Sequence, residues 1–300
     1  MDVEKTTALI LEAVNGGQTS FDADGAGCYI QVNVWEGDPA LNALCNTMNQ
    51  YRQMTVSYNF GETKETVTGE TICSWINGTV DGTVQVNADA VTAFVTDLAA
   101  RYDTAGTART FLTAAGTEVE LTGAYGWKID VAGEAAALTA LIQAGPAKEP
   151  VEREPVYSSA AVSRTAPDWG STYVEVDLTG QHVYMFQEGT LVWEAPCVTG
   201  NVSKNYTTPA GIYSLAYKER DKVLRGKKLA DGSYEYESPV SYWMPFNGGI
   251  GLHDANWRGT FGGTIYQTGG SHGCVNLPPS SVPALYELVY KGIPVICHGA

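Results

Sequence analysis

The stretch GGSHGCVNLPPSSV, residues 269–282, carries one of the six cysteines of the chain, two residues after a histidine. Its glycines let the backbone approach a ligand closely and leave N–H groups free to face an oxyanion. A thiol with an ordinary pKa of about 8.5 is only a few per cent thiolate at neutral pH, so a nucleophilic cysteine needs a base or cation nearby. The chemistry of Cys274 therefore depends on its neighbours.

Two histidines are candidate partners for Cys274. His272 lies two residues before it, on the same face if the segment is extended. His253 follows the apolar run GGIGL, as expected at a strand end, and the 17 residues between it and Ser271 let the chain return beside that strand. From these residues alone a nucleophilic site, a structural cluster, and a zinc site completed by His298 or water all remain open.

The composition describes a globular protein with an acidic surface. The 300 residues are 44% hydrophobic and 17% charged, with a net charge of −15. Because such a chain repels phosphate groups, we expect no nucleic acid partner and no anionic membrane surface. No apolar run approaches the roughly 20 residues that span a bilayer, and the start MDVEKTTALILEAV lacks the features of a signal peptide.

A change in composition predicts two domains. The segment 144–171 is rich in Pro, Glu, Ser and Ala and has no apolar periodicity, which is typical of a linker. We therefore predict a binding or spacer domain over residues 1–150, a linker over 151–169 and a second domain over 170–300.

The first half predicts an α+β domain. Alternating apolar residues predict a strand over 27–35, and apolar residues at helical spacing predict helices over 88–103 and 134–145. Asn87 or Asp89 would cap the first helix, and Gly145 would end the second. No tight internal repeat is visible, and no catalytic motif is found in this half.

The second half predicts a mainly-β domain, a sandwich or a barrel. Residues 171–200 form three alternating runs separated by Thr-Gly and Glu-Gly turns, and 222–246 reads as a hairpin that is first basic and then aromatic. Only 280–292 reads as a helix, with a Ser cap, a proline near its first turn and Gly292 at its end.

The second half resembles the catalytic domain of the L,D-transpeptidases (YkuD type). That family is marked by a His, a gap, then Ser/Thr-His-Gly-Cys, an apolar residue and Arg or Asn. Here His253 precedes Ser271-His272-Gly273-Cys274-Val275-Asn276, and the resemblance covers about residues 170–299. The turn and strand TTPAGIYSL, residues 207–215, also resemble the family. The first half resembles the peptidoglycan-binding domain that often precedes this catalytic domain, most clearly at YGWKID, residues 125–130.

The resemblance implies acyl transfer on peptidoglycan that forms 3→3 crosslinks between tetrapeptide stems. It implies Cys274 as the nucleophile and His253 as general base, with His272, Ser271 and Gly273 completing the catalytic set. Candidate substrate-binding residues are Arg258, Trp257, Tyr266, Trp243 and Asn276, and the hairpin 219–241 is a candidate lid. No metal and no cofactor are expected.

The resemblance also implies partners and a location. Peptidoglycan stem peptides are the expected substrate and carbapenem-type β-lactams the expected inhibitors, acting on a monomer outside the cytoplasm. An anchor or export signal would then lie in an N-terminal segment outside this sequence. Two alternatives are an L,D-carboxypeptidase, which uses water as acceptor, and a non-catalytic wall-binding module. The third stem residue, diaminopimelate or lysine, stays open.

The remaining cysteines do not predict a disulfide framework or a metal site. The sequence has no C-x-x-C pair, so it contains neither a zinc ribbon nor a thioredoxin motif. Six cysteines in 300 residues are too sparse for a disulfide scaffold, and free buried thiols are the simpler expectation. The sequence leaves open the disulfide state of Cys28, Cys45, Cys73, Cys197 and Cys297.

Overall fold

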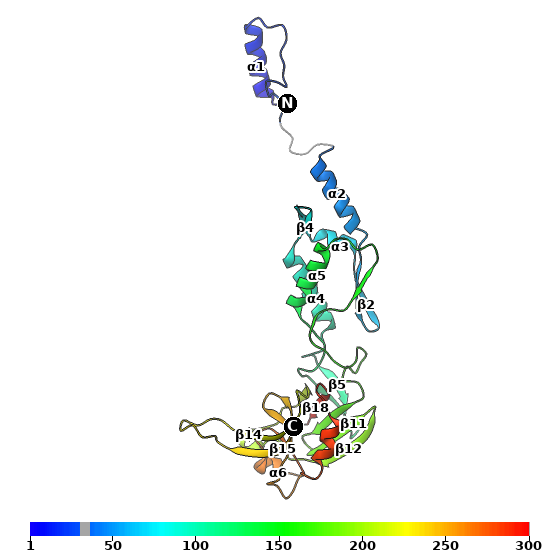
Figure 1. Cartoon of the computed structure of the whole chain (residues 1–300), viewed down its shortest axis with the longest axis vertical. Coiled ribbons are helices and arrows are strands. Elements are labelled where there is room, and N and C mark those ends of the chain that lie inside the picture. The colour runs from blue at the N-terminus through cyan, green and yellow to red at the C-terminus, as the bar shows by residue number, and fades with distance from the viewer. Residues whose placement is uncertain (31–36, 300) are drawn as a thin grey trace.

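The computed structural model describes residues 1–30 and 37–299. Three parts follow one another along the chain (Figure 1): a leading segment of residues 1–28, a central module of residues 37–159, and a C-terminal unit of residues 170–299. The predicted strand over 27–35 lies mostly outside the described residues. The fold is a helical N-terminal region followed by a mainly-β unit, as the sequence predicts.

The central module mixes helices with short strands. Its elements are α2 (Pro39–Tyr51), β1 (Val56–Phe60), β2 (Thr63–Val67), α3 (Gly69–Ser74), β3 (Ile76–Val80), β4 (Thr83–Val86), α4 (Ala88–Tyr102), β5 (Arg109–Leu112), β6 (Glu118–Leu121), β7 (Lys128–Ile129) and α5 (Val131–Gln143). The leading segment contributes α1 (Val3–Asn15).

Helices α4 and α5 form the core of this module because each has one apolar stripe. The α4 stripe of Val91, Val95 and Leu98 is buried, and Asn87 caps the helix by accepting from the N–H of Ala90. The predicted helix over 88–103 is therefore confirmed. Helix α5 begins three residues before the predicted start of 134, because Asp130 caps it.

The segment predicted as a linker contains two further strands. β8 (Val151–Arg153) pairs in parallel with β1, and β9 (Tyr157–Ser159) pairs with β7. The proline-rich composition hides these strands, because both pair with segments distant in sequence. The first part of this segment therefore belongs to the fold of the central module.

The C-terminal unit consists of two sheets. The first contains β10 (Tyr173–Asp177), β11 (His182–Gln187), β12 (Thr190–Pro196), β13 (Gly211–Ser214) and β18 (Pro294–His298), in the order β12-β11-β10-β18-β13. The second contains β14 (Glu219–Arg225), β15 (Glu237–Asn247), β16 (Ile250–Asp254) and β17 (Val275–Leu277), in chain order. Short helices η1 (Val202–Lys204) and α6 (Ile265–Gly269) each join two strands of one sheet, and α7 (Val282–Leu288) joins β17 to β18 in the other sheet.

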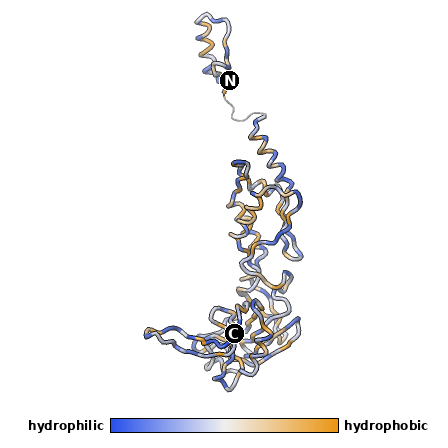
Figure 2. The backbone as a smooth tube through the Cα atoms, viewed as in Figure 1, coloured by the Kyte–Doolittle hydropathy of each residue, from blue (hydrophilic) through white to orange (hydrophobic). Residues whose placement is uncertain are grey.

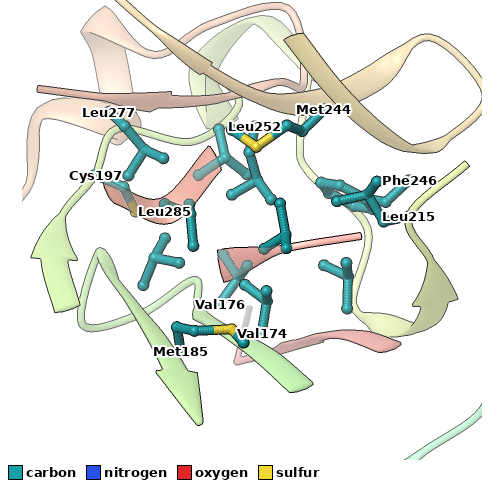
Figure 3. Close-up of a cluster of buried hydrophobic side chains, with 14 of the residues drawn as sticks. Val174, Val176, Met185, Cys197, Leu215, Met244, Phe246, Leu252, Leu277 and Leu285 are labelled. Atoms are coloured by element: carbon teal, nitrogen blue, oxygen red, sulfur yellow. The ribbon is translucent and has the colours of Figure 1, made fainter. Parts of the chain in front are cut away.

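The core of the C-terminal unit lies between these sheets. Figure 3 shows Val174, Val176 and Met185 of the first sheet facing Met244 and Leu252 of the second. Each of these five side chains is almost completely buried. Neither sheet closes on itself in the part of the chain described, so the unit resembles a sandwich and not a barrel.

The central module and the C-terminal unit meet through a small apolar cluster. Phe111 of β5 packs with Trp169, Ile212 and Ile296, and all four are buried. Backbone contact is close at Gly123, where an added Cβ would lie 2.1 Å from the carbonyl oxygen of Ile212. The β5–β6 hairpin is thereby held against the sheet that contains β18. Among the described residues, no helix has the length and apolar character needed to cross a bilayer.

Leu252→Ala should destabilise the C-terminal unit by about 2–5 kcal/mol, because it removes a fully buried side chain from between the two sheets. The matched change Leu191→Ala, at a half-exposed position of β12, should alter stability by less than about 0.5 kcal/mol. Chemical denaturation measures both values. Equal effects of the two substitutions would contradict the packing described here.

Candidate active site

The parallel pairing of β16 with β17 brings the predicted site residues together. The register aligns Leu252 with Val275 and His253 with Asn276. Leu252 and Val275 face the core, so the two polar side chains lie on the opposite face. Cys274 is two residues before Asn276 and therefore points to the same face as His253.

The turn before β17 is fixed by hydrogen bonds to its backbone. The Ser271 hydroxyl donates to the carbonyl of Cys274 at 2.5 Å and accepts from the N–H of Gly273 at 3.0 Å. Thr208 donates to the carbonyl of Gly273 at 2.6 Å. Gly273 has a φ of 120°, a conformation that other residues rarely adopt. Ser271 thus shapes the turn, and among the described residues its hydroxyl makes no hydrogen bond to a histidine ring.

A cavity of about 240 Å³ opens over this face. His253 and Cys274 both line it, together with Leu224, Tyr236, Ser238, Trp257, Arg258, Gly270, Ser271, His272 and Asn276. Leu224, Tyr236 and Ser238 come from β14 and β15 and the turn between them, so the hairpin that the sequence proposed as a lid supplies one wall. Of these wall residues, the sequence indicates Tyr236 as a ligand contact of the hairpin but does not single out Leu224 or Ser238.

His253 is poised to accept a proton. It is 2% exposed, and this burial lowers the pKa of its imidazole, an effect larger than the opposing influence of Asp254. The imidazole is therefore neutral at pH 7. Its Nδ1 lies 2.8 Å from the carbonyl oxygen of Asp254 and donates to it, which leaves Nε2 as the basic nitrogen.

The amide of Asn276 supports the same tautomer. In the orientation that satisfies both neighbours, its Nδ2 donates to His253 Nε2 at 3.0 Å and its Oδ1 accepts from Arg258 Nε at 2.7 Å. Arg258 also donates to the carbonyl of Gly269 at 2.9 Å. Arg258 therefore holds Asn276, and Asn276 holds the imidazole with Nε2 unprotonated.

Cys274 is a neutral thiol at physiological pH. Desolvation by burial raises the pKa of the thiol to about 11, which the nearby backbone of Gly251 only partly offsets. The Cys274 N–H has no acceptor within the part of the chain that the structure describes. This arrangement differs from a thiolate–imidazolium pair: the proton must leave the thiol during the reaction.

His272 occupies the rim of the cavity and not its floor. Its exposed ring lies 4.6 Å from the ring of Tyr236, nearly parallel to it, and 4.6 Å from the ring of Tyr206. Contacts between these aromatic rings hold the rim together. His272 is thus placed to orient a ligand at the mouth of the cavity.

The other predicted aromatic residues divide into two groups. Trp257 is half-exposed, lines the cavity, and lies 5.9 Å from the ring of His253. Trp243 packs behind His253 at 6.0 Å and is 4% exposed, so it supports the imidazole from inside the protein. Tyr266 lies in α6, and the cavity is lined without it.

The remaining cysteines and His298 lie away from this cavity. Cys28, Cys197 and Cys297 are buried free thiols, whereas Cys45 is exposed. His298 lies on β18, where its Nε2 is 2.8 Å from Glu175 Oε1. In the described residues, no group of three or more His, Cys, Asp or Glu side chains is arranged to hold a metal ion.

A larger cavity of about 730 Å³ lies where the central module meets the C-terminal unit. It is lined by Arg109, Trp127, Arg164 and Asp168 among others, and it shares no residue with the cavity at Cys274. Arg109 donates to Asp168 at 2.8 Å, so the charges there already balance each other in part. No cysteine or histidine is among the residues that line it, and the candidate chemistry belongs to the smaller cavity.

Two family models match the chain. Residues 171–297 match the L,D-transpeptidase catalytic domain, YkuD. Residues 39–149 match the family described as "Putative peptidoglycan binding domain".

Two solved structures are similar to most of the chain. A mutant of the Enterococcus faecium L,D-transpeptidase with serine in place of a cysteine is 33% identical, with a TM-score of 0.66, covering 85% of this chain and 99% of that one. The Ldtfm-avibactam carbamoyl enzyme is 33% identical, with a TM-score of 0.67, covering 85% and 98%. A comparison with curated proteins found no match.

Alkylation of Cys274 by iodoacetamide should accelerate by about tenfold per pH unit between pH 7 and 10, because the reactive thiolate forms only as the pH approaches the thiol pKa of about 11. Mass spectrometry of the peptide that contains Cys274 gives the rate, with the exposed Cys45 as a reference in the same sample. An alkylation rate that is already constant from pH 7 would show a preformed thiolate. It would contradict the assignment of a neutral Cys274 thiol beside a neutral His253 imidazole.

Proposed function

The chain belongs to the L,D-transpeptidase family, and we propose that Cys274 carries the acyl group while His253 moves the proton. The protein is a cysteine-dependent acyltransferase of the bacterial cell wall. One observation supports these roles most strongly: a neutral imidazole with an unprotonated Nε2 and a neutral thiol line the same cavity from adjacent parallel strands.

The first half-reaction forms a thioester. His253 Nε2 accepts the proton of the Cys274 thiol as the sulfur attacks the carbonyl between residue 3 and the terminal D-Ala of a tetrapeptide stem. The amide C–N bond then breaks, and the imidazolium returns the proton to the departing D-Ala nitrogen. Cys274 keeps the acyl group, and D-Ala leaves as a free amine.

The second half-reaction forms the crosslink. The side-chain amine of residue 3 in another stem attacks the thioester carbonyl and loses one proton to His253. The C–S bond breaks, the new amide forms, and the proton passes to the Cys274 sulfur. The free enzyme is restored, and a 3→3 crosslink joins the two stems.

The oxyanion formed in both steps needs a donor. The N–H of Cys274 is suited to this because it has no other acceptor in the described part of the chain. Removal of one oxyanion donor costs about 3 kcal/mol in related chemistry. The N–H of Gly273 already donates to the Ser271 hydroxyl. The contribution of Gly273 is therefore its positive φ, which allows the turn before Cys274.

Asn276 and Arg258 have positioning roles in this proposal. The N–H of Asn276 that faces His253 Nε2 favours the unprotonated ring, and it must give way as the thiol proton arrives. Arg258 holds that amide through its Oδ1. Both residues therefore adjust the basicity of His253, a role that differs from direct binding of a stem carboxylate.

The cavity walls suit a peptide stem. Tyr236, His272 and Trp257 offer aromatic surface, and Leu224 adds an aliphatic contact. We assign stem binding to these four residues. We also assign the reaction to residues 170–300 and wall binding to residues 1–150.

The location follows from the substrate. Peptidoglycan lies outside the cytoplasm, and the domains of this chain place it at the cell wall. We infer that it is a monomer that reaches this site through an N-terminal segment outside the sequence. Carbapenem-type β-lactams would acylate Cys274, since a strained amide carbonyl can replace the stem carbonyl.

Cys274→Ala should abolish dimer formation from disaccharide-tetrapeptide, because no other thiol lines the cavity. Binding to purified sacculi should be unchanged. The matched control Cys45→Ala removes an exposed thiol and should keep full activity. Mass spectrometry of the products measures turnover, and dimer formation by Cys274→Ala would disprove the role of this residue.

The acceptor distinguishes crosslinking from trimming. With disaccharide-tetrapeptide as the only substrate, we expect dimers and released D-Ala, and tripeptide as a minor product. Tripeptide without any dimer would identify an L,D-carboxypeptidase that uses the same residues. Mass spectrometry of the products over time separates these outcomes.

A further inference from the structure

Helix α1 exposes apolar side chains that no other element covers. Val3, Ile10 and Val14 are 71%, 42% and 64% exposed. Figure 2 shows hydrophobic positions along α1, which lies apart from the other helices. Within the described part of the chain, every hydrogen bond of residues 1–28 stays inside that segment. A helix of 13 residues is marginal without packing, so this face requires a partner.

The same element occurs a second time in the chain. Adding 128 to the bounds of α1, Val3–Asn15, gives the bounds of α5, Val131–Gln143. Each helix is capped by an aspartate, Asp2 or Asp130, which accepts from the backbone N–H three residues later. The two helices therefore begin and end in the same way.

The backbone hydrogen bonds repeat at the same spacing. The N–H of Asp2 donates to the carbonyl of Cys28, and the N–H of Asp130 donates to the carbonyl of Val156. These bonds bring the returning chain beside the start of each helix. The agreement therefore covers a helix and the point at which the chain returns beside its start.

The helix ends repeat as well. Gly17 donates to Val14 as Gly145 donates to Ile142. Both glycines have a positive φ, 75° and 111°. The two segments thus agree at the cap, the helix, its end and the bond that returns the chain, whereas residues 23–27 form a turn where the central module has β8.

The sequences explain why this repeat is hard to see. At the spacing of 128, the shared residues are Asp2 and Asp130, Val3 and Val131, Ala8 and Ala136, Gly17 and Gly145, and Tyr29 and Tyr157. The first and fourth pairs are cap and stop residues. Ile10 and Leu138, and Val14 and Ile142, keep their apolar character without identity.

The environment of the two helices differs. Leu138 and Ile142 of α5 are fully buried in the core of the central module, against α4 and β4. Their counterparts Ile10 and Val14 keep the apolar character and face solvent. The face of α1 thus has the pattern of a helix built to close such a core.

We propose that residues 2–28 are the closing element of a second module of the same fold, and that α1 is the docking surface for it. The occupant is a polypeptide with the fold of residues 39–129, which presents an apolar face like that of α4 and β4. The proposal does not depend on the chemistry of Cys274, because it rests on backbone geometry in the part of the chain before the C-terminal unit.

Two of the buried positions of α5, Glu134 and Ala135, correspond to threonines of α1, Thr6 and Thr7. Glu134 is completely buried and bonds with Tyr58, Arg153 and the N–H of Val156. Its counterpart Thr6 donates to the carbonyl of Asp2 instead. The module that docks on α1 therefore needs no buried ion pair at this point, and a test must keep Glu134 in place.

The test places the sequence of α1 in the position of α5 within the full chain. The sequence of residues 3–15 replaces residues 131–143, and Glu134 is retained. The substitution Glu12→Asp in the original N-terminal copy gives its peptides a different mass, so that mass spectrometry distinguishes the two copies. A control chimera carries Asp at the positions of Ile10 and Val14 in the transplanted copy. Hydrogen exchange and chemical denaturation of the central module are measured for both.

The transplanted copy should exchange at least about 100-fold more slowly than the N-terminal copy of the same molecule, and the central module should keep its cooperative unfolding. The control chimera with the two Asp substitutions should lose both the slow exchange and the cooperative unfolding. Equal exchange of the two copies, or loss of the module in both chimeras, would overturn the proposal. In the unaltered chain, protection of α1 equal to that of α5 would also overturn it, because the face would already be covered.

Discussion

The parallel register of β16 and β17 is the constraint on which the rest of the site depends. It aligns His253 with Asn276 and puts Cys274 on the same face, while Leu252 and Val275 anchor the two strands in the core. The tight turn at Gly273, held by Ser271 and Thr208, then sets the sulfur at the end of β17. A shift of one residue in this register would turn the imidazole or the thiol toward the core.

Burial decides how this pair can react. Desolvation lowers the pKa of His253 and raises the pKa of Cys274, so both groups are neutral before substrate arrives. The proton then moves only when the sulfur attacks, and the imidazole returns it to the leaving amine. Asn276 favours the basic Nε2 by donating to it, and Arg258 keeps that amide in place. A thiol that stays protonated is also protected from oxidation between turnovers.

Local signals in the sequence predict much of this fold. Asn87 and an apolar stripe define α4, and the Ser-His-Gly-Cys segment with its upstream histidine predicts the main partners of the site. Contacts between distant segments were not predictable: β8 pairs with β1, and Tyr206 and Tyr236 flank His272. The role of Trp243 behind His253 and the link from Arg258 to Asn276 likewise depend on tertiary packing, which periodicity does not report.

The most direct test of the account is the rate at which a carbapenem acylates the unaltered chain and the His253→Ala variant. Intact-mass spectrometry gives the rate, and peptide mass spectrometry identifies the acylated residue. We predict one adduct, on Cys274, and a loss of at least about 100-fold in rate at pH 7 for His253→Ala. That loss should shrink as the pH approaches 11, where the thiolate forms without a base. An adduct on another residue, or an unchanged rate in His253→Ala at pH 7, would contradict proton transfer from Cys274 to His253.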